Sequence, residues 1–136
     1  MKKKFFTGIL VLGFFGSCYK AQVTQPIVEQ VAPTTYKDDH IAIVDVKLQQ
    51  TGTNEVTFSF GTQFEKELTK IEVYGGSSKS NICSFFEKTV AVESHELKTY
   101  TALNSNAGTQ VNYYMIKYTT KAGNWSYSPL YKIVMK

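Results

Sequence analysis

Arginine is absent from this chain of 136 residues, and its basic side chains are 15 lysines and two histidines. Four lysines (Lys2, Lys3, Lys4 and Lys20) lie in an N-terminal segment that we expect to be removed, and the other 11 are matched by 11 acidic residues. Nucleic-acid-binding domains carry a basic patch and use arginine to recognise base edges. A neutral domain without arginine therefore argues against nucleic-acid binding.

Histidine and cysteine are scarce, with two of each. His40 and His95 are too few for a histidine-rich metal site. A serine and two glutamates surround His95, but a catalytic triad is a spatial arrangement, and the chain has no G-x-S-x-G motif. Cys83 lies in an apolar run typical of a strand, which favours a buried structural cysteine over a nucleophile. We therefore expect no enzyme activity, no cofactor and no metal site.

Long apolar runs are missing too. The longest one, residues 5–15, has 11 residues, about half of the ~20 that a membrane-spanning helix needs. It follows three lysines placed directly after Met1, which is the layout of a secretory signal peptide. We predict that residues 1–21 are a signal peptide, that cleavage follows the small residue Ala21, and that the protein is secreted or otherwise extracytoplasmic.

A second cleavage site competes with Ala21. Two small residues precede Cys18, which resembles a bacterial lipoprotein site whose cysteine becomes the lipidated first residue. Phe15 stands where that motif usually has leucine, so soluble release is favoured. The alternative is a membrane-anchored lipoprotein held through Cys18. In both cases Cys83 has no partner in the mature chain, and we expect no disulfide framework.

Residues 22–40 show little hydrophobic periodicity and contain Pro26 and Pro33, so we expect a linker or N-terminal arm ahead of the domain. The run Asp38-Asp39-His40 offers ligands for a cation. However, three neighbours in an extended chain do not converge on one ion, and no calcium-type loop follows. A solvated linker end is the favoured interpretation.

Residues 41–136 suit one small domain, and their pattern contains no convincing helix. Short β-branched and aromatic runs alternate with turn residues roughly every ten residues, which is typical of an all-β sandwich of two antiparallel sheets; a closed barrel is the alternative. Val56, Phe58 and Phe60 should face the core, and a bulge is expected after Ile43. About seven strands are expected, over residues 41–48, 56–60, 70–74, 82–92 (one or two strands), 97–103, 111–120 and 130–135, with a polar loop at residues 61–69.

The last third of the chain resembles a fibronectin type III domain. The matching residues run through that family's last three strands: Leu103, Gly108, Thr109, Tyr114, Ile116, Tyr118, Gly123, Ser126, Ser128 and Pro129. Phe60 ends the second strand, where the family usually has tryptophan, and Asn112 stands at the position of the tyrosine corner. The resemblance covers residues 41–135. It implies an immunoglobulin-like antiparallel β-sandwich that serves as an interaction module or spacer and brings no catalytic residues.

Trp125 is the most suggestive single residue for function. It follows Gly123 in the connection between the last two expected strands, and Tyr127 and Tyr131 are close in sequence. Exposed aromatic rings stack on sugars or anchor protein partners, whereas a buried Trp125 would only close the end of the core. We predict a non-enzymatic extracellular module that contacts a protein or carbohydrate through Trp125, Tyr127 and Tyr131. The alternative is a structural component that pairs through a sheet edge.

Overall fold

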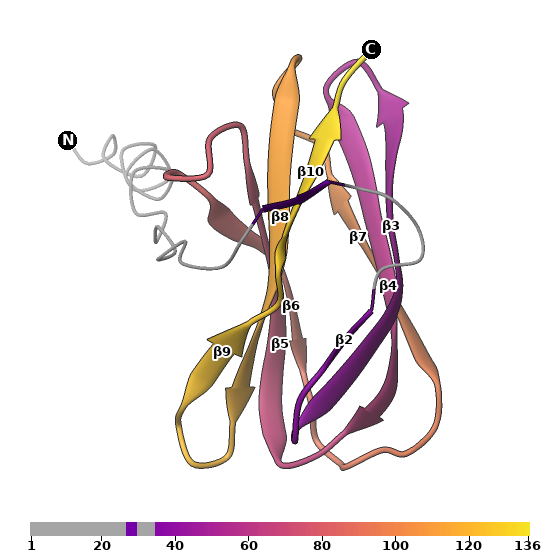
Figure 1. The fold of residues 1–136 in the computed structure, drawn as a ribbon, viewed down its shortest axis with the longest axis vertical. Helices are drawn as coiled ribbons and strands as arrows, with labels where there is room; N and C mark the ends of the chain where they lie inside the picture. Colours follow the sequence, from indigo (N-terminus) through magenta and orange to yellow (C-terminus); the bar gives the residue numbers. More distant parts are fainter. Residues whose placement is uncertain (1–26, 30–34) are drawn as a thin grey trace, which may run out of the picture.

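The computed structural model describes residues 27–29 and 35–136, and the regular structure of these residues consists of β-strands alone (Figure 1). Within this part of the chain, no helix is long and apolar enough to span a membrane. The predicted signal peptide, its cleavage after Ala21 and the alternative lipidation of Cys18 lie outside the described residues.

Ten strands follow one another along the described chain. They are β1 (Ile27–Glu29), β2 (Tyr36–Lys37), β3 (Ile41–Gly52), β4 (Glu55–Glu65), β5 (Leu68–Gly76), β6 (Cys83–Thr89), β7 (Lys98–Asn104), β8 (Val111–Thr120), β9 (Trp125–Tyr127) and β10 (Leu130–Val134).

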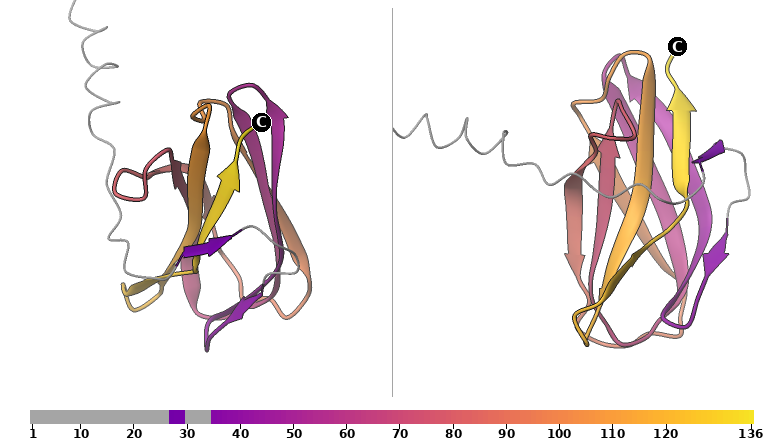
Figure 2. Two further views of the ribbon diagram at one scale, coloured as in Figure 1. Left: turned by 45° about the horizontal axis from the view of Figure 1, so that its top comes forward. Right: turned by 60° about the vertical axis from the view of Figure 1, so that its left-hand side comes forward.

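The strands form two sheets that pack against each other, as Figure 1 and the side view in Figure 2 show. One sheet has the order β1-β10-β8-β5-β6, with β9 also beside β8, and the other has the order β2-β3-β4-β7. All neighbouring strands are antiparallel except β1 and β10, which run parallel. The expected all-β sandwich is confirmed, with more strands than the sequence predicted.

The core lies between the two sheets. Val56, Phe58 and Phe60 alternate along β4 and are at most 1% exposed, as predicted. The ring of Phe58 stacks on that of Tyr114 in β8, with 5.8 Å between the centroids. Full burial of such a side chain stabilises a fold by about 2–3 kcal/mol. This contact therefore helps to hold the four-stranded sheet against the six-stranded one.

Residues 61–69 do not form the polar loop that their composition predicted. β4 continues to Glu65 and β5 starts at Leu68, which leaves a two-residue turn between the strands. The paired part of β4 includes Gly61 and Thr62, which stand opposite β7 in regular register. The prediction was wrong because the strands extend into this range and two of its polar residues, Thr62 and Glu65, are buried inside the sandwich.

Glu65 shows how this burial is tolerated. Its side chain is fully buried and accepts hydrogen bonds from the hydroxyls of Thr62 (2.7 Å) and Tyr100 (2.5 Å). The ammonium of Lys98 lies 3.2 Å from the other carboxylate oxygen. A buried charge is costly unless it is paired and hydrogen-bonded, and here both conditions are met.

β3 is irregular where a bulge was expected. Its register with β4 shifts on either side of the pair Ile43 and Val44. Asp45, inside the second shift, has a φ of 54°, in the left-handed region that few non-glycine residues adopt. The extra residue lets Ile43 and Val46 both face the core, where they are at most 2% exposed.

The range expected to be a linker, residues 22–40, contains β1 and β2, which pair with β10 and β3. Asp38 follows β2 and ties it to the core. One carboxylate oxygen accepts hydrogen bonds from the backbone N–H groups of His40 (2.8 Å) and Ile41 (3.0 Å), and the other accepts one from the buried Tyr118 hydroxyl. Among the residues that the structure describes, no group of three histidine, cysteine or acidic side chains is placed to hold a metal ion.

Candidate ligand-binding site

Trp125 and Tyr127 lie in a strand, β9, where the sequence predicted a loop. β9 pairs antiparallel with β8, and Tyr127 stands opposite Lys117 in this register. Both aromatic residues therefore belong to the outer face of the six-stranded sheet. Trp125 is 59% exposed, whereas Tyr127 is half-buried.

The turn before β9 explains why this short strand forms. The N–H of Thr120 donates to the carbonyl of Asn124 (2.7 Å), and the N–H of Gly123 donates to the carbonyl of Thr120 (2.9 Å). Gly123 has a φ of 91°, a conformation that only glycine adopts without strain. The chain is thereby reversed, and Trp125 returns alongside β8.

Lys117 lies beside the indole of Trp125. Its ammonium is 5.1 Å from the centre of the Trp125 ring and 5.7 Å from the centre of the Tyr74 ring, both within the range of a cation–π interaction. It is also 4.0 Å from the carboxylate of Glu72, which in turn is 3.7 Å from the ammonium of Lys70. Both lysines therefore share the carboxylate of Glu72 as their counter-ion.

Tyr127 completes the group by packing against Tyr74. The two rings meet edge to face at 89°, with 6.4 Å between the centroids. Burial, followed by the negative charge of Glu72, raises the pKa of Tyr74 to about 12, and the same two causes raise the pKa of Tyr127. Both hydroxyls stay protonated at neutral pH, and that of the half-buried Tyr127 can donate a hydrogen bond to a ligand.

We call these five residues the Trp125 patch: Trp125, Tyr127, Lys117, Tyr74 and Glu72. The patch adjoins a small apolar cluster that is separate from the main core. The cluster consists of Tyr74, Ile82, Met115 and Leu130, all at most 4% exposed, with Tyr113 and Tyr127 packed against it. Because its members are buried, the cluster gives the patch a packed and rigid base.

Sequence reasoning missed Lys117, Tyr74 and Glu72. Two of them carried a usable signal, since Lys117 interrupts the apolar run of β8 and Glu72 stands between the buried residues Ile71 and Val73. A charged residue at an outward position of a strand is ordinary, however, and only the pairing of β8 with β5 and β9 brings these side chains together.

Tyr131 does not belong to the patch, which corrects the prediction that it contacts a ligand. It is 1% exposed and its ring packs in the core, 6.1 Å from that of Phe58. The reason is strand alternation, because Tyr131 stands opposite the inward-facing Tyr114 in β8. Its hydroxyl has no hydrogen-bond partner among the described residues, and burial raises its pKa to about 12.

His95 and Cys83 were considered as catalytic residues from the sequence, and they lie in different elements of the structure. His95 is exposed in the connection between β6 and β7, where the neighbouring Ser94 forms backbone hydrogen bonds with Glu65. Cys83 is half-buried at the first position of β6, so it lies in a strand as predicted.

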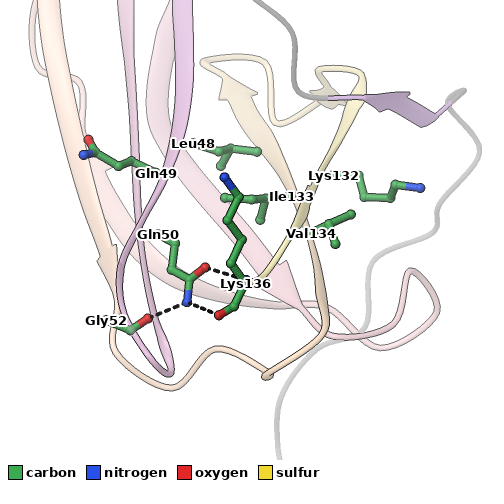
Figure 3. Close-up of a pocket in the computed structure, with 8 residues that line it drawn as sticks. All are labelled: Leu48, Gln49, Gln50, Gly52, Lys132, Ile133, Val134 and Lys136. Atoms are coloured by element: carbon green, nitrogen blue, oxygen red, sulfur yellow. Dashed lines mark hydrogen bonds between the residues drawn. The ribbon is translucent and has the colours of Figure 1, made fainter.

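An open hollow of about 700 Å³ lies between β3 and β10 (Figure 3). Gln50 lines this hollow, and its side-chain amide donates to the carbonyls of Gly52 (3.1 Å) and Lys136 (3.3 Å). The side-chain oxygen of Gln50 accepts the N–H of Lys136 (2.8 Å). The side-chain polar atoms of Gln50 are thus already hydrogen-bonded to the backbone of Lys136, and we assign no ligand to this hollow.

No family model, curated protein or solved structure matches the chain. The evidence for function therefore comes from the described side chains, and the Trp125 patch is the site that they support best.

Proposed function

We propose that this protein is a non-enzymatic interaction module that binds its partner through the Trp125 patch. The observation that carries the proposal is the 59% exposure of Trp125 on an otherwise packed sheet face, beside the ammonium of Lys117. Exposed aromatic rings bring a large contact area at a small cost in conformational entropy. A ring already held in place by its neighbours loses even less freedom on binding.

A carbohydrate partner suits the patch better than a protein partner. Stable protein interfaces cover about 800 Å² on each side around an apolar centre. Among the described residues, the other large apolar side chains with high exposure (Val92, Leu97, Leu103 and Val134) lie outside β8 and β9. One exposed indole matches the area of one sugar ring. Because Lys117 and Lys70 already have Glu72 as a counter-ion, we take an uncharged saccharide as the ligand.

The strand order supports a fibronectin type III-like identity for the module. β4 takes the place of the second strand in the resemblance, and β7, β8 and β9–β10 take those of the last three. β6 extends the sheet of β5 and β8. In constant-type immunoglobulin domains, by contrast, the fourth strand joins the sheet of the first two. Export by the predicted signal peptide would place the module outside the cytoplasm, where surface glycans occur.

The direct test is affinity electrophoresis of residues 22–136 in gels that contain a soluble polysaccharide, with neutral β-glucan, mannan and xyloglucan as probes and polygalacturonate as a charged comparison. We expect at least one neutral polymer to retard the protein, and Trp125→Ala to lose at least about tenfold in affinity. Val134→Ala, which truncates another exposed apolar side chain, is the matched control and should bind like the parent.

The chain has a single tryptophan, so its fluorescence reports directly on the patch. Addition of a retarding polysaccharide should change the emission of Trp125 and protect it from acrylamide quenching. Retardation that persists unchanged in Trp125→Ala would refute the Trp125 patch as the binding site. Absence of retardation by every neutral polymer would refute the saccharide as ligand.

A further inference from the structure

The edges of the two sheets are not protected equally. β3 is covered in part by β2 and has register shifts and the left-handed Asp45, β6 has a register shift against β5, and β10 is covered in part by β1. β7 differs, because it pairs with β4 at seven consecutive positions without any shift. No other described strand pairs with its second edge. β7 is therefore the regular open edge of the part of the chain that the structure describes.

The sequence of β7 does nothing to block pairing at this edge. Proteins usually guard an exposed edge with a proline, a bulge or a charged side chain. From Thr99 to Leu103 the strand has no charge and no proline, and its outward residues Thr99, Thr101 and Leu103 are all exposed. Leu103 is 55% exposed and Leu97, just before the strand, is 63% exposed. Threonine and leucine at such positions favour a further strand.

We propose that β7 is a self-association edge, at which two copies of this chain pair antiparallel about a two-fold axis through Thr101. In this register Thr101 faces Thr101 of the second copy, and Thr99 faces Leu103. The four-stranded sheets of the two copies then form one continuous sheet. Its strand order is β2-β3-β4-β7 in one copy, followed by β7-β4-β3-β2 in the other. Two-fold pairing of one edge with itself is the simplest closed arrangement, because it leaves no open β7 edge.

Charge favours a second copy as the occupant. The one charged residue of β7, Lys98, faces Asn104 across the two-fold axis, so no lysine meets another lysine. Its ammonium is already 3.2 Å from the carboxylate of Glu65. After removal of residues 1–21 the chain has 11 lysines and 11 acidic residues, so two copies do not repel each other through their net charge.

This inference is independent of the proposed function. β7 belongs to the four-stranded sheet, whereas the Trp125 patch lies on the outer face of the six-stranded sheet. A dimer formed through β7 therefore leaves the Trp125 patch of each copy accessible. The protein can then dimerise without binding a ligand and bind a ligand without dimerising.

The test is sedimentation velocity of residues 22–136 over a concentration series from micromolar to millimolar, with Thr101→Lys, Thr101→Glu and their equimolar mixture. We expect the parent chain to dimerise. Each single variant should weaken dimerisation about fivefold or more, because like charges then stand directly opposite each other. The mixture should restore the dimer, since lysine then faces glutamate. Thr51→Lys, at an exposed threonine in β3 of the same sheet, is the matched control and should dimerise like the parent.

Circular dichroism and thermal melting confirm that each variant is folded before it is compared. A parent chain that stays monomeric across the whole series overturns the proposal. A dimer that survives equally in Thr101→Lys and Thr51→Lys also overturns it, since the contact then lies elsewhere. Recovery in the mixture supports the register, because a charge pair rescues dimerisation only if the two positions meet.

Discussion

The side chain of Asn112 forms two hydrogen bonds with the backbone of one residue, Gly108. Its oxygen accepts the N–H of Gly108 at 2.8 Å, and its amide donates to the carbonyl of Gly108 at 2.9 Å. Asn112 is fully buried at the start of β8 and closes the connection from β7. Asn112 therefore ties the start of β8 to the backbone of the connection that precedes it.

Replacing Asn112 with alanine should lower the free energy of unfolding by about 2–3 kcal/mol, because it leaves the N–H and carbonyl of Gly108 without their partner. Urea denaturation followed by fluorescence measures the change. Asn106→Ala, in the exposed part of the same loop, should change stability by less than about 0.5 kcal/mol. Equal effects of the two substitutions would contradict a special role for Asn112.

Lys117→Met should release Trp125 from the sheet. The substitution keeps the length of the side chain but removes the cation between the rings of Trp125 and Tyr74, and it should cost about 1 kcal/mol. We expect acrylamide to quench Trp125 more strongly in this variant. Lys121→Met, in the exposed turn before β9, is the control and should leave quenching unchanged. If both variants behave alike, Lys117 does not hold the indole.

Glu65→Ala should destabilise the domain by about 3–5 kcal/mol, because Lys98 and two buried hydroxyls lose their common acceptor. The matched control is Glu67→Ala, two residues further along and exposed, which should cost less than about 1 kcal/mol. Denaturant midpoints of both variants give the comparison. A loss below about 1 kcal/mol for Glu65→Ala would show that the buried cluster contributes little to stability.

The stability of the domain should fall between about pH 10 and about pH 12. Burial raises the pKa of Tyr114 and that of Tyr131 from 10.0 to about 12. The folded state therefore keeps protons that the unfolded state begins to lose at pH 10, so the stabilisation is complete below pH 10 and is lost as the pH approaches 12. Urea denaturation at several pH values, together with the ultraviolet absorbance of tyrosinate, tests this.

Tyr131→Phe separates the contribution of one tyrosine. Because the Tyr131 hydroxyl is buried without a partner among the described residues, its removal should leave stability at pH 7 unchanged or raise it. The same variant should lose part of the alkaline dependence. A protein that stays folded while all its tyrosines titrate near pH 10 would contradict the burial of these hydroxyls.

Intact mass of the exported protein should equal that of residues 22–136, with no lipid attached, since Ala21 precedes the favoured cleavage site. A mass that corresponds to a chain starting at a lipidated Cys18 would instead establish a membrane anchor.

Much of this domain could be predicted from local pattern alone. The alternation of Val56, Phe58 and Phe60 predicts a strand with one buried face, because successive side chains of a strand point to opposite sides. The run of residues 111–120 coincides with β8 for the same reason. Turn residues between such runs then imply antiparallel sheets. These features depend on neighbours in sequence, and so the sequence by itself determined the all-β class and most of the strands.

Tertiary structure decided which polar residues are buried and which aromatic residues are exposed. Glu65 is buried because Thr62, Tyr100 and Lys98 converge on it from two strands, a fact that composition cannot contain. Trp125 and Tyr131 are both aromatic and close in sequence, yet one is 59% and the other 1% exposed. Their environments differ because β9 and β10 pair with different parts of β8, and only that register determines which side chain faces solvent.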